Sequence, residues 1–234
     1  WACVLRSVLL NSVFYKAIIE GAVIKESCFN GSSEMVSQLA TAITTFLFNN
    51  IMMELLGENG VAAITIIIYS QFLLNTLYIG YSIGIAPVIG FNYGNKNDVQ
   101  QKKVFRISMG FIAAASVLIF SVYMFGSSHI VRLFAEDTSE VYQIAANGFT
   151  IFSFSFLFCG LNNFTSAMFT ALSNGKVSAV LSFLRTFGLL AGGILLLPRI
   201  WGTTGVWMAV PIAEGIMFFV SMICLIHFRK RYSY

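Results

Sequence analysis

Charged side chains are scarce in this sequence. Asp, Glu, Lys and Arg make up 10% of its 234 residues, hydrophobic residues make up 57%, and the mean hydropathy is +0.80. An ordinary soluble domain has about 25% charged and roughly 45–50% apolar residues. Apolar runs of roughly 20 residues, long enough to cross a bilayer, recur along most of the chain. A single signal peptide therefore does not explain them. The composition therefore predicts a polytopic protein embedded in a lipid bilayer.

Residues that build catalytic and metal sites are also few. His129 and His227 stand alone near predicted helix ends, and the cysteines form no CxxC pair, so we expect no metal site and no cofactor. Gly175 and Lys176 lack the upstream glycine of a P-loop. Basic residues do not gather with aromatic residues in one stripe, which argues against a nucleic acid partner. We therefore expect no enzyme, and reduced, buried thiols at Cys3, Cys28, Cys159 and Cys224.

Six apolar runs predict six transmembrane helices. Helices are expected because open sheets cannot satisfy their backbone polar groups in lipid, and no run alternates like a barrel strand. The segment 127–141 mixes apolar and polar residues, as in a short amphipathic helix at the interface or a plain loop. The six runs cover residues 31–53, 61–92, 104–126, 142–171, 177–198 and 205–228.

Positive charges mark one side of these predicted spans. Of the 14 Lys and Arg residues, 12 lie in connectors or span ends on one side, and only Arg132 and Arg199 lie on the other. The positive-inside rule makes the first side cytoplasmic. An even number of spans then places both ends of the six-helix unit in the cytoplasm, so we expect a multi-pass protein of the cell (plasma) membrane.

The first residues resemble the end of another hydrophobic segment. The sequence starts with Trp1 and stays apolar to about residue 15, before a more charged stretch. We expect residues 1–28 to be the end of a truncated preceding helix plus a connector. Residues 29–228 would form the six-helix lobe, and 229–234 a cytoplasmic tail. A processed signal would also produce a start without Met.

Polar residues follow helical spacing in three of the predicted spans. In the second span they recur at i, i+4, i+7 and i+11, and in the fourth span two neighbouring asparagines are embedded among apolar residues. Faces of this kind do not suit lipid, and they predict a water-accessible cavity. The candidate cavity residues from these spans are Glu34, Gln38, Thr41, Gln71, Asn75, Tyr78, Asn162 and Asn163.

Two carboxylates lie within the predicted spans. Glu34 follows Asn30, a good N-cap, so a place in the first turn fits helix capping as well as function. Glu214 lies in mid-span, three residues after Pro211, which frees a backbone carbonyl. An ionisable group inside a membrane is a functional candidate. We expect Glu214 to face a cavity or another helix, with Arg185 as one candidate partner.

The second span contains an unusual stretch, YSIGIAPVIGFNYG. Pro87 has no amide hydrogen and crowds the carbonyl of Ile83, which favours bending. Gly80 and Gly84 form a small-xxx-small face that another helix can approach closely. We expect this segment to bend and pack beside the cavity, although membrane helices also tolerate glycine and proline for purely structural reasons.

Five motifs, in this order, resemble the C-terminal lobe of the multidrug and toxic compound extrusion (MATE) transporters, in a branch of bacterial efflux pumps. Together they extend over about 200 of the 234 residues. The motifs are NGSSEMVSQLATAITT, LLGENGVAA, IGYSIGIAPVIGFNYGNKN, GLNNFTSAMFTALSNGKVSAVLSFLRT and LLPRIWGTTGVWMAVPIAE.

This resemblance implies two six-helix lobes facing each other across a cavity. It implies export of amphipathic, often cationic small molecules by alternating access, driven by a proton or sodium gradient, from a bacterial inner membrane. The six spans would be the second lobe, so the expected partner is the missing N-terminal six-helix lobe. The segment around Pro87 would line the cavity or flex beside it. Some branches carry a cation-site acid where this chain has Thr41, so the resemblance transfers no cation site.

Two other functions remain open at the level of sequence. The wider superfamily includes flippases for lipid-linked or polysaccharide precursors, which a cavity with several Arg or Lys residues would favour. A self-sufficient six-helix channel or scaffold, working as a homodimer, is the third interpretation.

Overall fold

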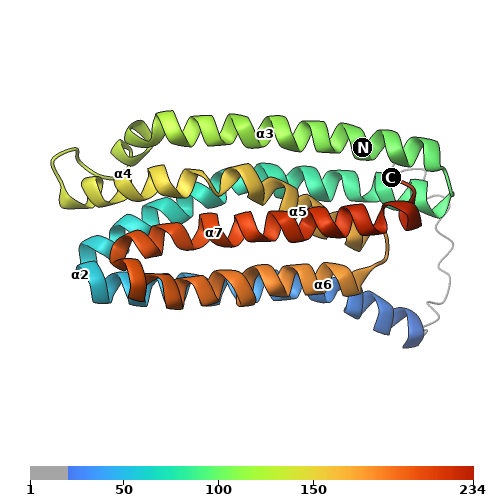
Figure 1. Cartoon of the computed structure of the whole chain (residues 1–234), viewed down its shortest axis with the longest axis horizontal. Helices are drawn as coiled ribbons and strands as arrows, with labels where there is room; N and C mark the ends of the chain where they lie inside the picture. Colours follow the sequence, from blue (N-terminus) through green and yellow to red (C-terminus); the bar gives the residue numbers. More distant parts are fainter. Residues whose placement is uncertain (1–20) are drawn as a thin grey trace, which may run out of the picture.

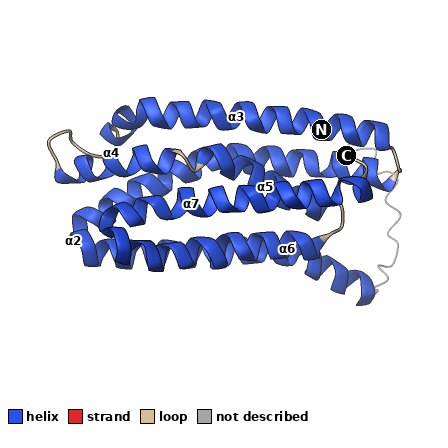
Figure 2. Cartoon of the chain, viewed as in Figure 1, coloured by secondary structure: helices blue, strands red, loops and turns tan. Residues whose placement is uncertain are grey.

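A computed structural model describes residues 21–234, and the predicted helix end within residues 1–20 lies outside the described residues. Between positions 23 and 37 several side chains, including that of Glu34, are also outside the description. Figure 2 shows helices joined by short loops, with no strand in the described part of the chain. The elements are α2 (Gly21–Gly94), α3 (Asp98–Arg132), α4 (Glu140–Ser153), α5 (Phe156–Ala171), α6 (Gly175–Phe183), the π-helix η1 (Leu184–Ala191) and α7 (Gly192–Tyr232).

The longest helices are folded back on themselves. At 1.5 Å per residue the 74 residues of α2 would extend about 110 Å, far beyond a hydrocarbon core of roughly 30 Å. The backbone breaks at Gly57, where φ is 63° and ψ is −150°, a conformation that glycine alone adopts readily. A similar break occurs in α7 at Gly202, with φ 57° and ψ −135°. Figure 1 shows the chain reversing direction at both places.

The number of membrane-length segments follows from these breaks. In the described residues, three helical stretches are long and apolar enough to cross a membrane, and the bent pair α4 and α5 makes a fourth. The stretches are Gln38–Gly94, Asp98–Arg132 and Gly175–Tyr232. The first and third each consist of two helices that meet at a glycine. The described residues therefore form six antiparallel segments, which confirms the predicted all-α membrane fold.

The predicted span 142–171 is broken rather than continuous. Helices α4 and α5 meet at an angle of 56°. Beside the break, the Ser153 hydroxyl donates to the Thr150 carbonyl and the Ser155 hydroxyl donates to the Phe152 carbonyl, both at 2.7 Å. Serine hydroxyls that bond the preceding turn compete with the helical ladder and bend it. This bend occurs without proline, and the sequence pattern did not predict it.

Two predicted connectors are helical. The segment 127–141 is not a separate amphipathic helix, because its first part continues α3 to Arg132 and a turn then leads to α4. Residues 21–28, predicted as a connector, belong to α2. Cys28 is exposed there, unlike buried Cys159 and half-buried Cys224, so the prediction of buried cysteines was wrong for Cys28.

The glycine and proline stretch does not bend the helix. Backbone angles stay helical through Pro87, and the break in α2 lies at Gly57 instead. Gly80 and Gly84 have open space where a Cβ would be, so no described helix packs closely on that face. One lost hydrogen bond near the end of a long helix does not override the packing of its other turns. The close approach occurs at Gly90, where a Cβ would lie 3.3 Å from the Ala171 carbonyl.

Aromatic side chains fill the core between α2, α3, α4 and α5. The ring of Tyr123 stacks on Phe149 with centroids 5.0 Å apart, and its centroid lies 4.3 Å from that of Phe156. Beside them Gly160 lets α5 approach Tyr78, because a Cβ at position 160 would lie 2.7 Å from that ring. This packing holds α5 at the centre of the lobe, between α3 and α7.

The two ends of the lobe differ in charge. Figure 1 places the starts of α3 and α6 and the end of α7 at one end. That end carries the basic residues of these segments, namely Lys96, Lys102, Lys103, Arg106, Lys176, Arg229, Lys230 and Arg231. The opposite end, around Gly57, the α3–α4 turn and Gly202, carries Glu54, Glu58, Glu136, Asp137 and Glu140 beside Arg132 and Arg199. The charge pattern of the sequence is thus an asymmetry of the folded lobe.

Candidate functional site

A cavity of about 300 Å³ opens between both halves of α2, the end of α5, η1 and the middle of α7. Apolar and polar side chains share its wall, the apolar ones including Phe48, Ile68 and Phe72. Its polar lining comes from elements far apart in the sequence, which the fold brings to one side of α5. The polar lining residues are Gln38, Thr41, Thr44, Thr45, Gln71, Asn75, Ser82, Asn163, Ser166, Thr170, Ser182, Arg185, Thr186 and Glu214.

A buried ion pair lies in the wall of this cavity. Arg185 of η1 contacts the Oε1 atom of Glu214 through Nη2 at 2.7 Å and through Nε at 2.8 Å. The side chains of Arg185 and Glu214 are 20% and 6% exposed. Burial makes both charges expensive unless further hydrogen bonds satisfy them. The carboxylate and the guanidinium therefore need polar neighbours.

Two adjacent asparagines of α5 supply those hydrogen bonds. Asn162 donates from Nδ2 to Glu214 Oε2 at 2.8 Å and to the main-chain carbonyl of Glu214 at 3.0 Å, while its Oδ1 accepts from the Ser221 hydroxyl at 2.9 Å. Asn163 Oδ1 accepts from Arg185 Nη1 at 2.6 Å. Both charged groups are thus bound from α5 as well as from each other.

The π-helix η1 places Arg185 in this network. It occupies Leu184–Ala191 between α6 and α7. Helices of this kind are rare and frequently occur at functional sites, because they interrupt the regular α-helical register. On the opposite side Pro211 lies one turn before Glu214 and removes a backbone donor. Arg185 therefore comes from a π-helical segment, and Glu214 from an α-helical segment that lacks one backbone donor.

A group of hydroxyls extends the polar wall toward the basic end. Ser166 lies 2.9 Å from the Ser178 hydroxyl and 3.0 Å from the Ser182 hydroxyl. The Thr170 hydroxyl donates to Ser178 at 2.8 Å. Hydroxyls both donate and accept, so this wall can rearrange its hydrogen bonds around a ligand.

The family of the chain follows from a model that covers most of it. The model described as MatE matches residues 35–191, more than half of the chain. The chain belongs to the MatE family. No curated protein sequence matches it.

Solved structures share this fold at low sequence identity. An outward-facing multidrug resistance MATE family transporter of the MOP superfamily matches with TM-score 0.82 and 20% identity, over 93% of this chain and 50% of the other. A mutant of the Vibrio cholerae MATE transporter VcmN matches with TM-score 0.86 and 19% identity, over 98% and 53%. A MOP superfamily transporter from Pyrococcus furiosus, described with a binding pocket of reversed polarity, matches with TM-score 0.84 and 19% identity, over 98% and 53%.

The solved transporters that match are longer than this chain. The chain spans about half the length of each of these solved transporters. Within the MatE family, this chain has helices that are long and apolar enough to span a membrane as its framework.

In this MatE chain most of the predicted cavity residues come together. The structure places six of them in the cavity wall: Gln38, Thr41, Gln71, Asn75, Asn163 and Glu214. The pairing of Glu214 with Arg185 is also present. The side chain of Glu34 is outside the description, so its predicted role stays a prediction.

Three other predicted residues lie outside the cavity wall. Tyr78 is buried in the core, where its hydroxyl donates to the Phe156 carbonyl at 3.2 Å beside the α4–α5 break. Asn162 is buried behind the cavity and bonds Glu214 from there. Pro87 is exposed and does not itself line the cavity. Ser82 and Ile83 of the same stretch do line the cavity, so the segment lies beside it, although it does not bend.

Sequence reasoning named Arg185 but missed the other cavity residues of α6 and η1. Ser182 and Thr186 line the cavity, and Arg185 lies there between them. Their spacing of four residues, on a run otherwise rich in Leu and Phe, was a usable signal of a polar face. Ser221 also escaped notice, because a single serine in an apolar helix has no distinctive pattern.

Proposed function

We propose that this chain is the C-terminal six-helix lobe of a cation-coupled multidrug exporter that works by alternating access. The cavity carries this proposal, because it combines an apolar wall, many amide and hydroxyl groups and one buried ion pair. Sites for small molecules are mostly apolar with a few convergent polar groups. Amphipathic, often cationic substrates fit such a wall, since aromatic rings contact their apolar parts and amide and hydroxyl oxygens accept hydrogen bonds from their polar groups.

The proposed partner is an N-terminal lobe with six helices of its own. The chain covers 49–54% of the solved transporters whose fold it shares, so a second lobe would face the open side of the cavity. We propose that the beginning of α2 and the end of α7 both face the cytoplasm, because the basic residues gather at the end of the lobe that contains them. A bacterial inner membrane is the proposed location.

We propose proton or sodium coupling through the ion pair. Among the described side chains, Glu214 is the carboxylate that lies in mid-span, and the others lie near the helix ends. A proton or a sodium ion that binds Glu214 would compete with Arg185 for the same oxygens. Release of Arg185 would then alter the contacts that η1 makes with α5 and α7. The two conformations of the exporter would differ in this contact.

The cavity wall does not favour a flippase for anionic precursors. A site for phosphate-bearing precursors would be expected to present several unpaired cations. Among the residues that line this cavity there is one cation, Arg185, and it is paired with Glu214. The homodimeric channel or scaffold is the remaining alternative, and it is distinguished by activity of the chain alone.

Drug accumulation in cells tests the proposal directly. Cells would express the 234-residue chain alone, or together with a preceding six-helix lobe. We expect reduced accumulation of an amphipathic cationic dye only when both lobes are present. Efflux by the chain alone would contradict the half-transporter proposal and favour the homodimer.

Cysteine labelling tests the cavity within the assembled transporter. In a background without native cysteines, Gln71→Cys and Asn75→Cys should react with a membrane-impermeant maleimide, because both positions line the cavity. Leu73→Cys is the matched control from the same helix, since Leu73 is 74% exposed and does not line the cavity. Equal labelling of all three positions, or labelling of Leu73→Cys alone, would contradict the assignment of the cavity.

A further inference from the structure

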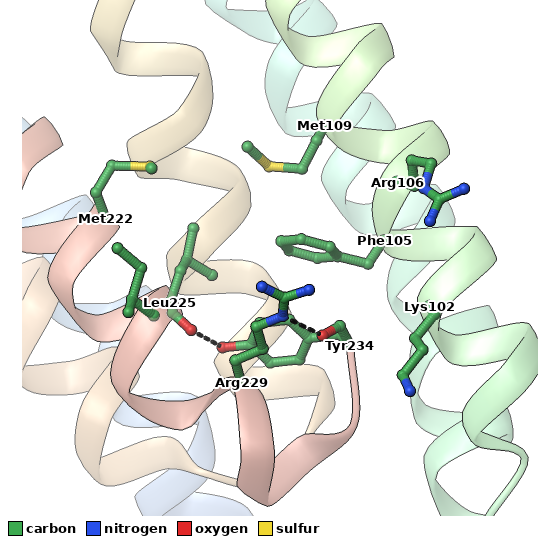
Figure 3. A pocket seen from close by; sticks show the side chains of 9 residues that line it. Lys102, Phe105, Arg106, Met109, Met222, Leu225, Arg229 and Tyr234 are labelled. Atoms are coloured by element: carbon green, nitrogen blue, oxygen red, sulfur yellow. Dashed lines mark hydrogen bonds between the residues drawn. The ribbon is translucent and has the colours of Figure 1, made fainter.

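A second cavity lies at the basic end of the lobe, between the beginning of α3 and the end of α7. It has a volume of about 350 Å³ and shares no lining residue with the first cavity. Figure 3 shows Phe105 and Met109 pointing from α3 across the gap toward Leu225 and Met222 of α7. We call this space the basic groove.

Ring packing and hydrogen bonds hold together the floor of the basic groove. The ring centroids of Phe105 and Tyr234 lie 4.6 Å apart. The Tyr234 hydroxyl donates to the Leu225 carbonyl at 2.9 Å, and Arg229 Nε donates to the Tyr234 main-chain carbonyl at 3.3 Å. Figure 3 shows the guanidinium of Arg229 between the two helices at the end of the groove. The groove is therefore a built site, with an apolar bed and a cation at one end.

Three basic residues line this groove. They are Lys102 and Arg106, one turn apart on α3, and Arg229 on α7. The two ion pairs found among the described residues, Arg132–Asp137 and Arg185–Glu214, involve none of them. All three lie at the end of the lobe where the other basic residues gather, so the charge around the groove is mainly positive.

We propose that the basic groove binds an anionic phospholipid. Its acyl chain would lie along Met109, Leu225 and Met222, and its phosphate would be bound by Lys102, Arg106 and Arg229. The groove matches both parts of a phospholipid. Its apolar bed suits a hydrocarbon chain, and basic pockets between transmembrane helices on one side of a membrane bind lipid head groups. Arg229 and Arg106 can bind phosphate oxygens in a bidentate manner.

A free anion or a transported drug fits this groove less well. A free anion would use only the basic rim and would leave the apolar bed open to lipid or water. A cationic drug would meet three like charges. A phospholipid uses both parts at once, and the surrounding bilayer supplies it. The proposal does not depend on export, because a lipid can occupy the groove whether or not the other cavity transports a substrate.

Lipid binding is measured on the complete protein, purified and placed in nanodiscs of phosphatidylcholine. Phosphatidylglycerol is added in increasing amounts, and the retained molecules are counted by native mass spectrometry. The test variant combines Lys102→Gln, Arg106→Gln and Arg229→Gln. We expect its affinity for phosphatidylglycerol to fall about tenfold or more, because each basic residue near an anionic head group contributes substantially. Arg106→Gln alone should weaken binding by roughly fivefold.

The matched control removes the same charge from outside the groove. The control variant combines Lys103→Gln, Lys176→Gln and Lys230→Gln. These three lysines are exposed at the same end of the lobe, and we expect near-normal phosphatidylglycerol binding by this variant. Equal loss in both triple variants would overturn the proposal, because the charge of the whole surface would then suffice. The single variant Arg106→Gln keeps the test valid if the triple variant does not fold.

Inorganic phosphate distinguishes a lipid from a free anion. Added at millimolar concentration, it should leave the retained phosphatidylglycerol in place, because it cannot use the apolar bed. Displacement of the lipid by inorganic phosphate would show that the groove recognises the anion alone, and the proposal would be wrong. Met222→Trp, which fills the bed and keeps every charge, should reduce lipid binding. Normal binding by this variant would also overturn the proposal.

Discussion

Two regions of the lobe contain nearly the same polar contacts in different surroundings. In the membrane interior, Arg185 contacts Glu214 at 2.7 Å, and Asn162 donates to the same carboxylate at 2.8 Å. At the acidic end, Arg132 contacts Asp137 at 2.8 Å, and Asn59 donates to Glu140 at 2.7 Å. The interior ion pair has side chains 20% and 6% exposed, whereas those of the surface pair are 53% and 52% exposed.

The comparison shows that distance alone does not reveal what an ion pair does. Water solvates the surface pair whether or not its partners meet, so its contribution to stability is small. Around the interior pair, Asn162 and Asn163 take the place of water, and Ser221 in turn bonds Asn162. Because desolvation offsets much of the attraction, a buried pair is weak evidence for stability and better evidence for a specific role. Changes at the two sites should therefore have very different effects.

The largest expected effect comes from Glu214→Ala. This change leaves the Arg185 guanidinium buried without its carboxylate, which typically costs about 3–5 kcal/mol. We expect a clearly lower thermal unfolding midpoint in detergent and loss of efflux. Asp137→Ala at the surface is the control, measured by the same scan. A midpoint for Glu214→Ala equal to that of the control would show that water reaches the interior pair freely.

The next effect is expected from Asn162→Leu. It removes the donor to Glu214 and the acceptor of the Ser221 hydroxyl, so several buried polar groups lose their partner. An unsatisfied buried group costs roughly 1–3 kcal/mol. Denaturant titration of the purified protein measures the change in the free energy of unfolding. Asn59→Leu removes the matching surface contact and should leave the titration unchanged, and equal losses would break the comparison.

A double substitution separates stability from function. Arg185→Met combined with Glu214→Met replaces the whole pair with apolar side chains of similar length. Such replacements are often neutral or stabilising, within about 1–4 kcal/mol. We expect an unfolding midpoint near that of the unaltered protein, together with abolished drug efflux. Preserved efflux in this variant would contradict a transport role for the pair.

The smallest expected effect comes from removing the surface pair altogether. Arg132→Ala combined with Asp137→Ala should change neither the unfolding midpoint nor efflux, because exposed ion pairs often contribute nothing measurable. Both readouts come from the assays already used for the interior variants. A drop as large as that of Glu214→Ala would mean that the α3–α4 turn is a structural anchor.

Several features were predictable from the sequence because they depend on local composition. The six spans follow from apolar runs, and the breaks at Gly57 and Gly202 fall within the predicted connectors 54–60 and 199–204. Polar spacing in the first two spans indicated candidate residues such as Gln71 and Asn75, and the structure places both in the wall of the cavity. Periodicity indicates that residues share a face, and here the polar face is the one that turns toward α5.

Other features could not be predicted in this way. Tyr78 and Pro87 lie on the same predicted helix as Gln71 and Asn75, yet one is buried in the core and the other is exposed outside the cavity. Helix rotation relative to its neighbours decides this, and it depends on packing across the whole lobe. The bend between α4 and α5 and the π-helix η1 likewise have no strong local signal.

The sequence by itself determined that this is an α-helical membrane chain with a basic and an acidic side. Hydropathy and charge are summed over neighbouring residues, so they need no knowledge of distant contacts. Only the tertiary structure decided that Arg185 and Asn162 meet at Glu214, and that Ser221 bonds Asn162 behind them. Residues 162 and 221 are 59 positions apart, and their meeting depends on how α5 and α7 cross. Burial removes the water that would otherwise solvate the charge of Glu214, so this carboxylate requires these protein partners.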